Sequence, residues 1–313
     1  MRQTFGFGGE KETFEDEFNQ LPGKKDVSRL TVTLGKLSVS DIFDENKYAS
    51  DPRTNFWNWS MWESGAFDYA ADQKGYTWGM ALDFNQKTWA LRGGYFLIPI
   101  FSNVQSLDHA LLRRGQYVGE LEMRYTLGSQ PGTIKLLGWF SRANAGSYRE
   151  ALDDPAIDPN TAIEDSRRSR TKFGYAFSLE QALTKDLGAF ARVSWADGQS
   201  EIMSFTDIDA SLAVGLSLKG TRWGRPDDTV GLGGAVNALS SAHKDYIAAG
   251  GLGVLIGDGK LNYADERIWE AYYSLALRKR TFVTFDYQLA TNPGYNGDRG
   301  PVSIFGTRFH ADF

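Results

Sequence analysis

The sequence predicts an all-β protein made of antiparallel strands, and three observations predict it. Apolar residues recur at every second position through most of the chain, which is the period of a strand with one apolar face. Aromatic residues are abundant (9 Trp, 14 Tyr and 20 Phe), as is glycine with 34 residues, which suits strands joined by turns. The mean hydropathy is -0.39, and no apolar run approaches the ~18 residues of a membrane helix.

Charge and cysteine content exclude several classes of function. The net charge of -5 means that basic residues are not in excess, so nucleic acid is not an expected partner. The chain has no cysteine, which excludes a disulfide scaffold, a thiolate zinc site and a cysteine nucleophile. No metal site and no cofactor are predicted.

Alternation defines the predicted strands. In 75–84 one face carries Tyr76, Trp78, Met80, Leu82 and Phe84. Equally regular segments follow at 117–127, 172–181, 210–220, 269–278, 280–289 and 304–313, and less regular ones lie near 4–10, 29–39, 88–97, 133–142, 186–196 and 229–238. Turn residues separate these segments, as in SQPG and LIGDG. We therefore expect about thirteen antiparallel strands of a length that crosses a membrane.

The two faces of these strands favour a membrane barrel. The polar face carries small and hydroxylic residues with isolated charges, as a water-filled lumen requires, while aromatic residues near strand ends resemble interfacial girdles. The last strand alternates and ends in Phe313, which is typical of outer-membrane barrels. A soluble barrel or sandwich remains the alternative. The prediction is a transmembrane antiparallel β-barrel of the porin type, with 1–313 as a single domain.

Five long stretches carry a resemblance to a known family. They are 26–60 (DVSRLTVTLGKLSVSDIFDENKYASDPRTNFWNWS), 65–72, 216–234, 248–277 and 292–313. The chain resembles the carbohydrate-selective porins of Gram-negative outer membranes, the OprB-like group. The resemblance implies a barrel of sixteen strands, outer-membrane localisation and passive diffusion of monosaccharides such as glucose. It also implies contact with outer-membrane lipid and lipopolysaccharide, and with the barrel-assembly machinery through the strand ending in Phe313.

The start of the chain departs from the family pattern. Family members carry a signal peptide and further strands ahead of the segment that resembles RQTFGFGGE, whereas here Met1 stands directly before it. An odd strand number is unusual for a closed single-chain barrel. The expectation is that about three strands are missing, or that the barrel is smaller or open.

The long connection 40–74 is the predicted constriction loop, because a connection of this length is uncommon unless it is functional. In the family the corresponding loop folds into the lumen. The predicted sugar contacts on it are Arg53, Trp57, Trp59, Trp62 and Asp68, since aromatic rings stack on sugar C–H faces and charged groups bond hydroxyls. The alternative is an aromatic cluster that only pins the loop to the wall.

Charges on the inner faces of the strands complete the predicted sugar path. They are Glu120, Glu122, Arg124, Arg168, Arg170, Glu180 and Arg192. Opposed acidic and basic walls are expected to bind neutral polyols without favouring either ion. The alternative is a salt-bridge network that stiffens the wall. Arg308, on the last strand, is expected to lie away from the constriction.

Two other classes of function remain open, although no enzyme is predicted. The first is an outer-membrane hydrolase of lipids or peptides, which requires a Ser or Asp beside His109, His243 or His310; no hydrolase motif accompanies these residues. The second is a barrel that serves as an anchor or adhesin without transport.

Overall fold

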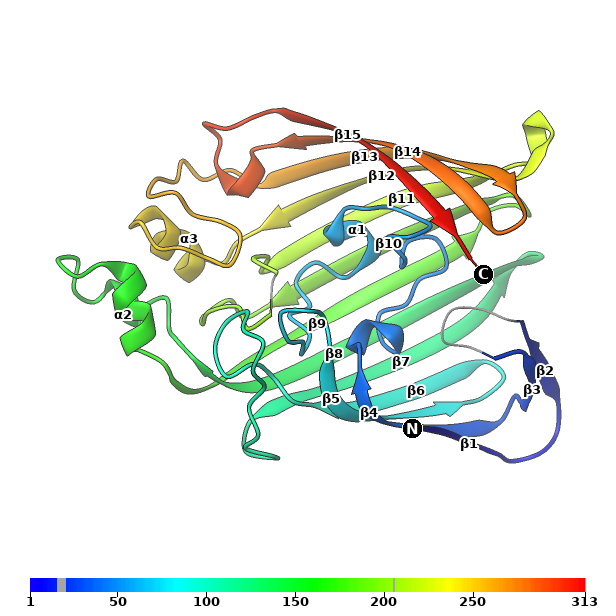
Figure 1. Ribbon diagram of the computed structural model, residues 1–313, viewed down its shortest axis with the longest axis horizontal. Helices are drawn as coiled ribbons and strands as arrows, with labels where there is room; N and C mark the ends of the chain where they lie inside the picture. The colour runs from blue at the N-terminus through cyan, green and yellow to red at the C-terminus, as the bar shows by residue number, and fades with distance from the viewer. Residues whose placement is uncertain (16–20, 205, 313) are drawn as a thin grey trace.

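A computed structural model describes residues 1–15, 21–204 and 206–312, and most of these residues belong to one curved sheet (Figure 1). Thirteen strands pair in the order β1-β4-β5-β6-β7-β8-β9-β10-β11-β12-β13-β14-β15, and every neighbouring pair is antiparallel. The strands are β1 (Arg2–Gly6), β4 (Arg29–Leu37), β5 (Thr77–Asn85), β6 (Trp89–Phe96), β7 (Gly115–Leu127), β8 (Gln130–Ala145), β9 (Arg168–Ala182), β10 (Leu187–Ala196), β11 (Ala210–Gly220), β12 (Arg225–Ala238), β13 (Glu266–Arg278), β14 (Thr281–Thr291) and β15 (Val302–Ala311). The predicted fold class is confirmed.

The remaining elements are short. A separate hairpin pairs β2 (Lys11–Phe14) with β3 (Gly23–Asp26) inside the β1–β4 connection. The helices are α1 (Trp59–Trp62), α2 (Pro159–Asp165), α3 (Ser241–Ala248) and the 3-10 turns η1 (Val39–Asp41), η2 (Glu150–Leu152), η3 (Thr221–Trp223) and η4 (Pro293–Tyr295). Within the described ranges, none of these helices is long and apolar enough to cross a membrane.

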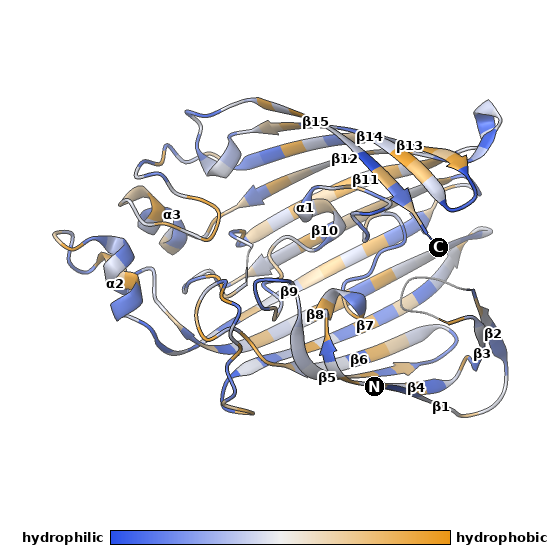
Figure 2. Ribbon diagram, in the orientation of Figure 1, coloured by the Kyte–Doolittle hydropathy of each residue, from blue (hydrophilic) through white to orange (hydrophobic). Residues whose placement is uncertain are grey.

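The sheet has one apolar face and one polar face, and hydrophilic and hydrophobic residues alternate along its strands (Figure 2). Large apolar side chains on the outer face are widely exposed, for example Trp78 at 54% and Trp269 at 59%. Polar residues such as Glu120, Arg192 and Glu270 point inward and are buried. A soluble protein does not expose apolar surface on this scale, whereas a barrel in lipid requires it.

The two ends of the sheet differ. Five connections at one end are tight turns, such as Gly128–Ser129 between β7 and β8 and Lys279–Arg280 between β13 and β14. The other end carries the long connections with α2 and α3 (Figure 1). Strand β15 ends beside the short turns, where Ala311 pairs with Thr281. Phe313, at which the last strand is predicted to end, lies outside the described residues.

The thirteen predicted strands of the sheet are all present. In the described part of the chain, β1 and β15 stand at the two ends of the strand order and are not paired with each other. The hairpin β2–β3 is the one paired element that the alternation pattern did not predict.

The connection between β4 and β5, residues 38–76, lies across the concave side of the sheet (Figure 1). We call it the inner loop. Its phenylalanines pack against aromatic rings of the wall: Phe56 lies 5.4 Å from Phe190, and Phe67 lies 5.0 Å from Trp139, between ring centroids. Such pairs stabilise beyond the apolar area that they bury. The inner loop contains the predicted segment 40–74, and its role as the constriction stays a prediction.

Glycine at one wall position permits this close approach. A Cβ atom built on Gly306 of β15 would lie 2.1 Å from the Trp57 ring, a separation that no real contact tolerates. The wall is thus shaped to receive this loop.

Candidate functional site: the inner loop and the charged wall

Arg192 of β10 is a deeply buried anchor of the inner loop. Its guanidinium donates to the carbonyl oxygens of Met61 at 2.6 Å, Asp44 at 2.7 Å and Ala49, and lies 3.5 Å from the Asp44 carboxylate. The five donors of an arginine suit this task, because the loop carbonyls have no strand partner. Arg192 thus fastens both arms of the loop to the wall.

Wall carboxylates bind the backbone N–H groups of the loop. Glu120 accepts from Asp44 N at 2.8 Å, and Glu180 accepts from Lys47 N at 2.6 Å. Glu270 accepts from Trp57 N at 2.5 Å and from the next N–H at 2.9 Å. These charge-assisted bonds fix the irregular backbone of the loop at three places around the wall.

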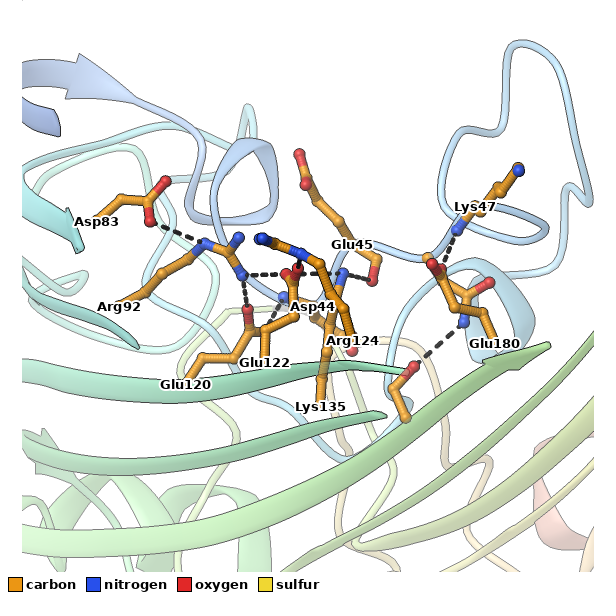
Figure 3. Close-up of polar contacts among 12 residues, drawn as sticks. Asp44, Glu45, Lys47, Asp83, Arg92, Glu120, Glu122, Arg124, Lys135 and Glu180 are labelled. Atoms are coloured by element: carbon orange, nitrogen blue, oxygen red, sulfur yellow. Dashed lines mark hydrogen bonds and ion pairs between the residues drawn. The ribbon is translucent and has the colours of Figure 1, made fainter. Parts of the chain in front are cut away.

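A cluster of charges surrounds Arg92 of β6 (Figure 3). Arg92 Nη1 lies 2.6 Å from Glu120 and 2.7 Å from Glu122, and its Nε lies 3.7 Å from Asp83. Lys135 lies 3.8 Å from Glu122 and donates to the Glu45 carbonyl. Acidic and basic side chains therefore mix on one wall, instead of facing each other from opposed walls as expected. Their charges largely offset one another.

A small polar cavity lies beside this cluster. Its volume is about 70 Å³, and its charged lining residues include Arg2, Asp41, Glu45, Asp83 and Arg92. A space of this size holds a few water molecules.

The three predicted loop tryptophans have different surroundings. The Trp57 ring packs on Gly306, and the Arg308 guanidinium lies over it at 5.3 Å. Trp59 lies edge-on to Trp62 at 4.7 Å and stacks on Tyr69 at 5.8 Å. These contacts agree with the alternative interpretation for Trp57, that of a wall contact, and its contact with sugar stays a prediction. Trp59 and Trp62 are half-buried, and their sugar contact stays a prediction.

The other two predicted loop residues also make protein contacts. Asp68 is buried and accepts from the backbone N–H groups of Met203 and Ser204, both at 2.9 Å, while Lys172 lies 3.4 Å away. It joins the inner loop to the β10–β11 connection. Arg53 pairs with Asp51 at 2.8 Å within the loop.

Three predicted arginines lie toward the ends of the sheet. Arg168 and Arg170 both pair with Glu150 of η2 at the long-loop end. Arg124 pairs with Glu122 and donates to the Gln86 carbonyl at the β5–β6 turn. The structure therefore does not gather all predicted residues at one point. It groups Glu120, Glu122 and Arg124 in the charged cluster, and their contact with sugar stays a prediction.

The expectation for Arg308 is wrong. Its guanidinium donates to the carbonyl oxygens of Pro52 and Asn55, so it contacts the inner loop, which is the predicted constriction loop. The reason is the path of the inner loop, which passes the lumen side of β15 far from its own strands.

Sequence reasoning also missed Arg92, Lys135 and Glu270 as site residues. Arg92 lies in LRGGYF, where Gly93 and Gly94 interrupt the alternation that identifies a strand face. Glu270 lies at a polar position of the alternating segment 269–278, but nothing in its local sequence marks it as a partner of loop N–H groups. For Arg92 and Glu270, the position on the inner face of a strand was the one sequence feature that could have indicated a role in the site.

Glu63 makes the inner loop sensitive to pH. Its side chain is almost fully buried, and burial, together with the nearby Asp44 carboxylate, raises the pKa of Glu63 well above its ordinary value. A raised carboxyl pKa means that the folded state binds the proton more tightly than the unfolded state. The contribution of Glu63 to the free energy of unfolding is complete below the unfolded-state pKa of about 4.3. It is lost as the pH rises through the raised pKa of the folded state.

Glu63→Gln mimics the neutral carboxyl. We therefore expect the unfolding temperature of this variant to decrease less with rising pH than that of the wild type. The measurement is the thermal unfolding temperature of both proteins in detergent from about pH 5 to about pH 9. Glu164→Gln, an exposed carboxylate on α2, is the control and should leave the slope unchanged. Equal slopes in wild type and Glu63→Gln would contradict the assignment.

Two of the histidines lie beside a carboxylate: His243 beside Asp209, and His310, whose Nε2 lies 2.9 Å from Asp312. His243 Nδ1 lies 2.9 Å from Asp209, but the pair is buried and the ring stacks against Tyr148 at 4.3 Å. The nearby Ser240 hydroxyl donates to the Gly198 carbonyl. This arrangement fastens α3 to the neighbouring loops. The described residues also contain no group of three His, Asp or Glu side chains suited to hold a metal.

An apolar outer face, a polar inner face and a loop bound across the lumen define the porin class of outer-membrane channel. Residues 2–313 match the model of the carbohydrate-selective porin, OprB family. The chain belongs to this family. Membership and fold point to a sugar-selective outer-membrane channel rather than to an enzyme.

Solved structures agree on the fold. Pseudomonas putida OprB is similar with a TM-score of 0.72 at 19% identity, over 91% of this chain and 70% of that chain. The outer-membrane channel DcaP of Acinetobacter baumannii has a TM-score of 0.50 at 11% identity, over 97% of this chain and 80% of that chain. Comparison with curated proteins yields no match.

Proposed function

We propose that the channel passes neutral monosaccharides, such as glucose, by passive diffusion. The observation that carries this proposal is the lining of the constriction, where mutually offset charges around Arg92 lie on one wall and the half-buried rings of Trp59 and Trp62 lie on the inner loop. Paired charges offer hydroxyl partners without a strong preference for either ion. Aromatic rings offer the C–H faces of a sugar a stacking surface.

The same proposal covers the surroundings of the channel. The exposed apolar outer face is suited to outer-membrane lipid, including lipopolysaccharide, with the long-loop end outside the cell and the short turns toward the periplasm. The final strand, β15, is the segment offered to the barrel-assembly machinery. The membrane is that of a Gram-negative bacterium.

Single-channel current in a planar bilayer tests the proposal. Glucose is expected to reduce the current saturably, because a sugar bound in the constriction excludes ions while it resides there. A sugar acid of similar size, glucuronate, should block less. Current that falls only in proportion to the bulk conductivity of the glucose solution would refute sugar selectivity.

Trp59→Ala and Trp57→Ala are expected to separate sugar stacking from loop anchoring. Loss of the Trp59 ring should raise the half-blocking glucose concentration about two- to tenfold, as expected for an aromatic contact worth ~0.5–1.5 kcal/mol. Trp57→Ala should instead lower the unfolding temperature, because its ring fills the space over Gly306. Bilayer titration and thermal unfolding of both variants measure the two effects; the reverse assignment would show that Trp57 is the sugar contact.

A further inference from the structure

A second, larger cavity opens at the long-loop end of the sheet. Its volume is about 350 Å³. The tip of the inner loop, Asn58–Ser60, lines one side, and the first residues of β13 and the connections around Thr206 and Tyr295 line the others. It lies on the side of the inner loop that faces the long connections, whereas the small cavity lies against β1, β4, β5 and β6.

The two cavities differ in volume, and only one has the size of a ligand site. Ligand sites usually measure about 300–1,000 Å³, so the larger cavity is of ligand size at the lower end of that range. This suits one hexose ring rather than an oligosaccharide. The 70 Å³ cavity beside Arg92 lies below that range.

The lining combines an aromatic ring with polar groups that retain bonding capacity. Trp59 and Ile268 contribute apolar surface. The Thr206 hydroxyl is buried and has no hydrogen-bond partner among the described residues. Glu266 accepts one bond at each carboxylate oxygen, from Gly294 N at 3.0 Å and from Asn237 at 3.3 Å. Each oxygen has a further lone pair, so the carboxylate can accept again from a ligand hydroxyl.

Charge in the cavity selects against anions. Glu266 and Asp207 both line it, and the lining cation Arg299 is already paired with Asp258. A sugar acid or sugar phosphate would meet two carboxylates in a partly enclosed space, where repulsion is stronger than in bulk water. A neutral polyol meets acceptors for its hydroxyls instead.

We infer that this cavity is an entry subsite for one neutral hexose, occupied before the sugar reaches the section beside Arg92. The inference rests on the proposed function and adds the residues that capture the sugar. Trp59 supplies the stacking face, Glu266 accepts from sugar hydroxyls, and the Thr206 hydroxyl gains the partner that the protein does not provide. An otherwise unpaired buried hydroxyl is costly to the fold, which favours its use in binding.

Thr206→Val is the first test, with D-glucose as the probe in planar bilayers. The substitution removes a hydroxyl without a protein partner and keeps the side-chain shape, so the unfolding temperature should not fall. Loss of one hydrogen bond is expected to raise the half-blocking glucose concentration about two- to tenfold. Thr161→Val, on exposed α2 away from the cavity, is the matched control and should leave glucose block unchanged.

Ile256→Trp is the second test, because it fills the cavity from the long-loop side. It should raise the half-blocking concentration more than tenfold. If glucose blocks the wild type and both variants at the same half-blocking concentration, the entry subsite is overturned and the proposed function stands. Absence of block in the wild type would overturn the proposed function itself. Equal block by D-glucuronate would overturn the assignment of a neutral ligand.

Discussion

Arg192→Met is expected to release the inner loop from the wall and to give the largest loss of stability of any single change considered. The substitution keeps the apolar stem but leaves three loop carbonyls and the Asp44 carboxylate without their shared partner. Breaking a buried ion pair on one side costs about 3–5 kcal/mol. Thermal unfolding should show this loss, and single-channel recordings should show a larger and noisier ion current, because a detached loop no longer narrows the lumen.

Arg149→Met is the control for this experiment. Arg149 pairs with Asp245 on the surface, where both side chains are half-exposed at 52%, and exposed pairs contribute about 0–1 kcal/mol. The control should resemble the wild type in stability and conductance. An Arg192→Met channel with wild-type conductance would show that the inner loop is held without its buried anchor.

Arg92→Met is expected to shift the ion preference of the channel toward cations. The guanidinium offsets Glu120 and Glu122 at 2.6 and 2.7 Å, and its loss leaves the cluster one unit more negative. A difference of about 1 kcal/mol between the interactions with a passing potassium ion and a passing chloride ion corresponds to about a fivefold change in the potassium-to-chloride permeability ratio. The reversal potential under a potassium chloride gradient measures this ratio.

Arg142→Met makes the same change of charge outside the lumen. Arg142 is exposed on the outer side of β8 and bonds Ser169. Its loss should leave the reversal potential unchanged. Equal shifts in the two variants would show that overall charge, rather than the cluster around Arg92, sets the preference.

Alternation along each strand predicted the fold because a barrel strand meets two different solvents. Leu82 and Asp83 are neighbours in sequence, yet one is exposed on the outer face and the other lies beside Arg92. That two-residue period is a local property, so it is visible in the sequence. It identified all thirteen strands of the sheet, including the irregular β6.

The arrangement within the lumen was less accessible because its contacts join distant parts of the chain. Arg308 and Pro52 are separated by 256 positions, and Trp57 and Glu270 by 213. No local pattern encodes such pairs. Inner-face position indicated that Glu180 and Arg192 face the lumen, but not that they bind the loop backbone at Lys47 N and Met61 O. From sequence alone, the wall charges could serve either to bind sugar or to stabilise the wall through salt bridges. In the structure, Glu180 and Arg192 make direct contacts with the backbone of the inner loop.

Asp41→Cys offers the most direct test of the central claim that sugar passes the inner loop inside the barrel. The chain has no cysteine, so this thiol is unique. Asp41 is exposed on the inner loop and lines the space beside Arg92. A control, Leu82→Cys, places the thiol on the outer face, where modification should not change the current.

The measurement is the rate at which a charged methanethiosulfonate reagent reduces the current through Asp41→Cys channels, with and without glucose. Modification is expected to reduce the current, and glucose is expected to slow the modification in a saturable manner, because bound sugar obstructs the same passage. Modification that leaves the current unchanged, or proceeds at the same rate in saturating glucose, would contradict this expectation.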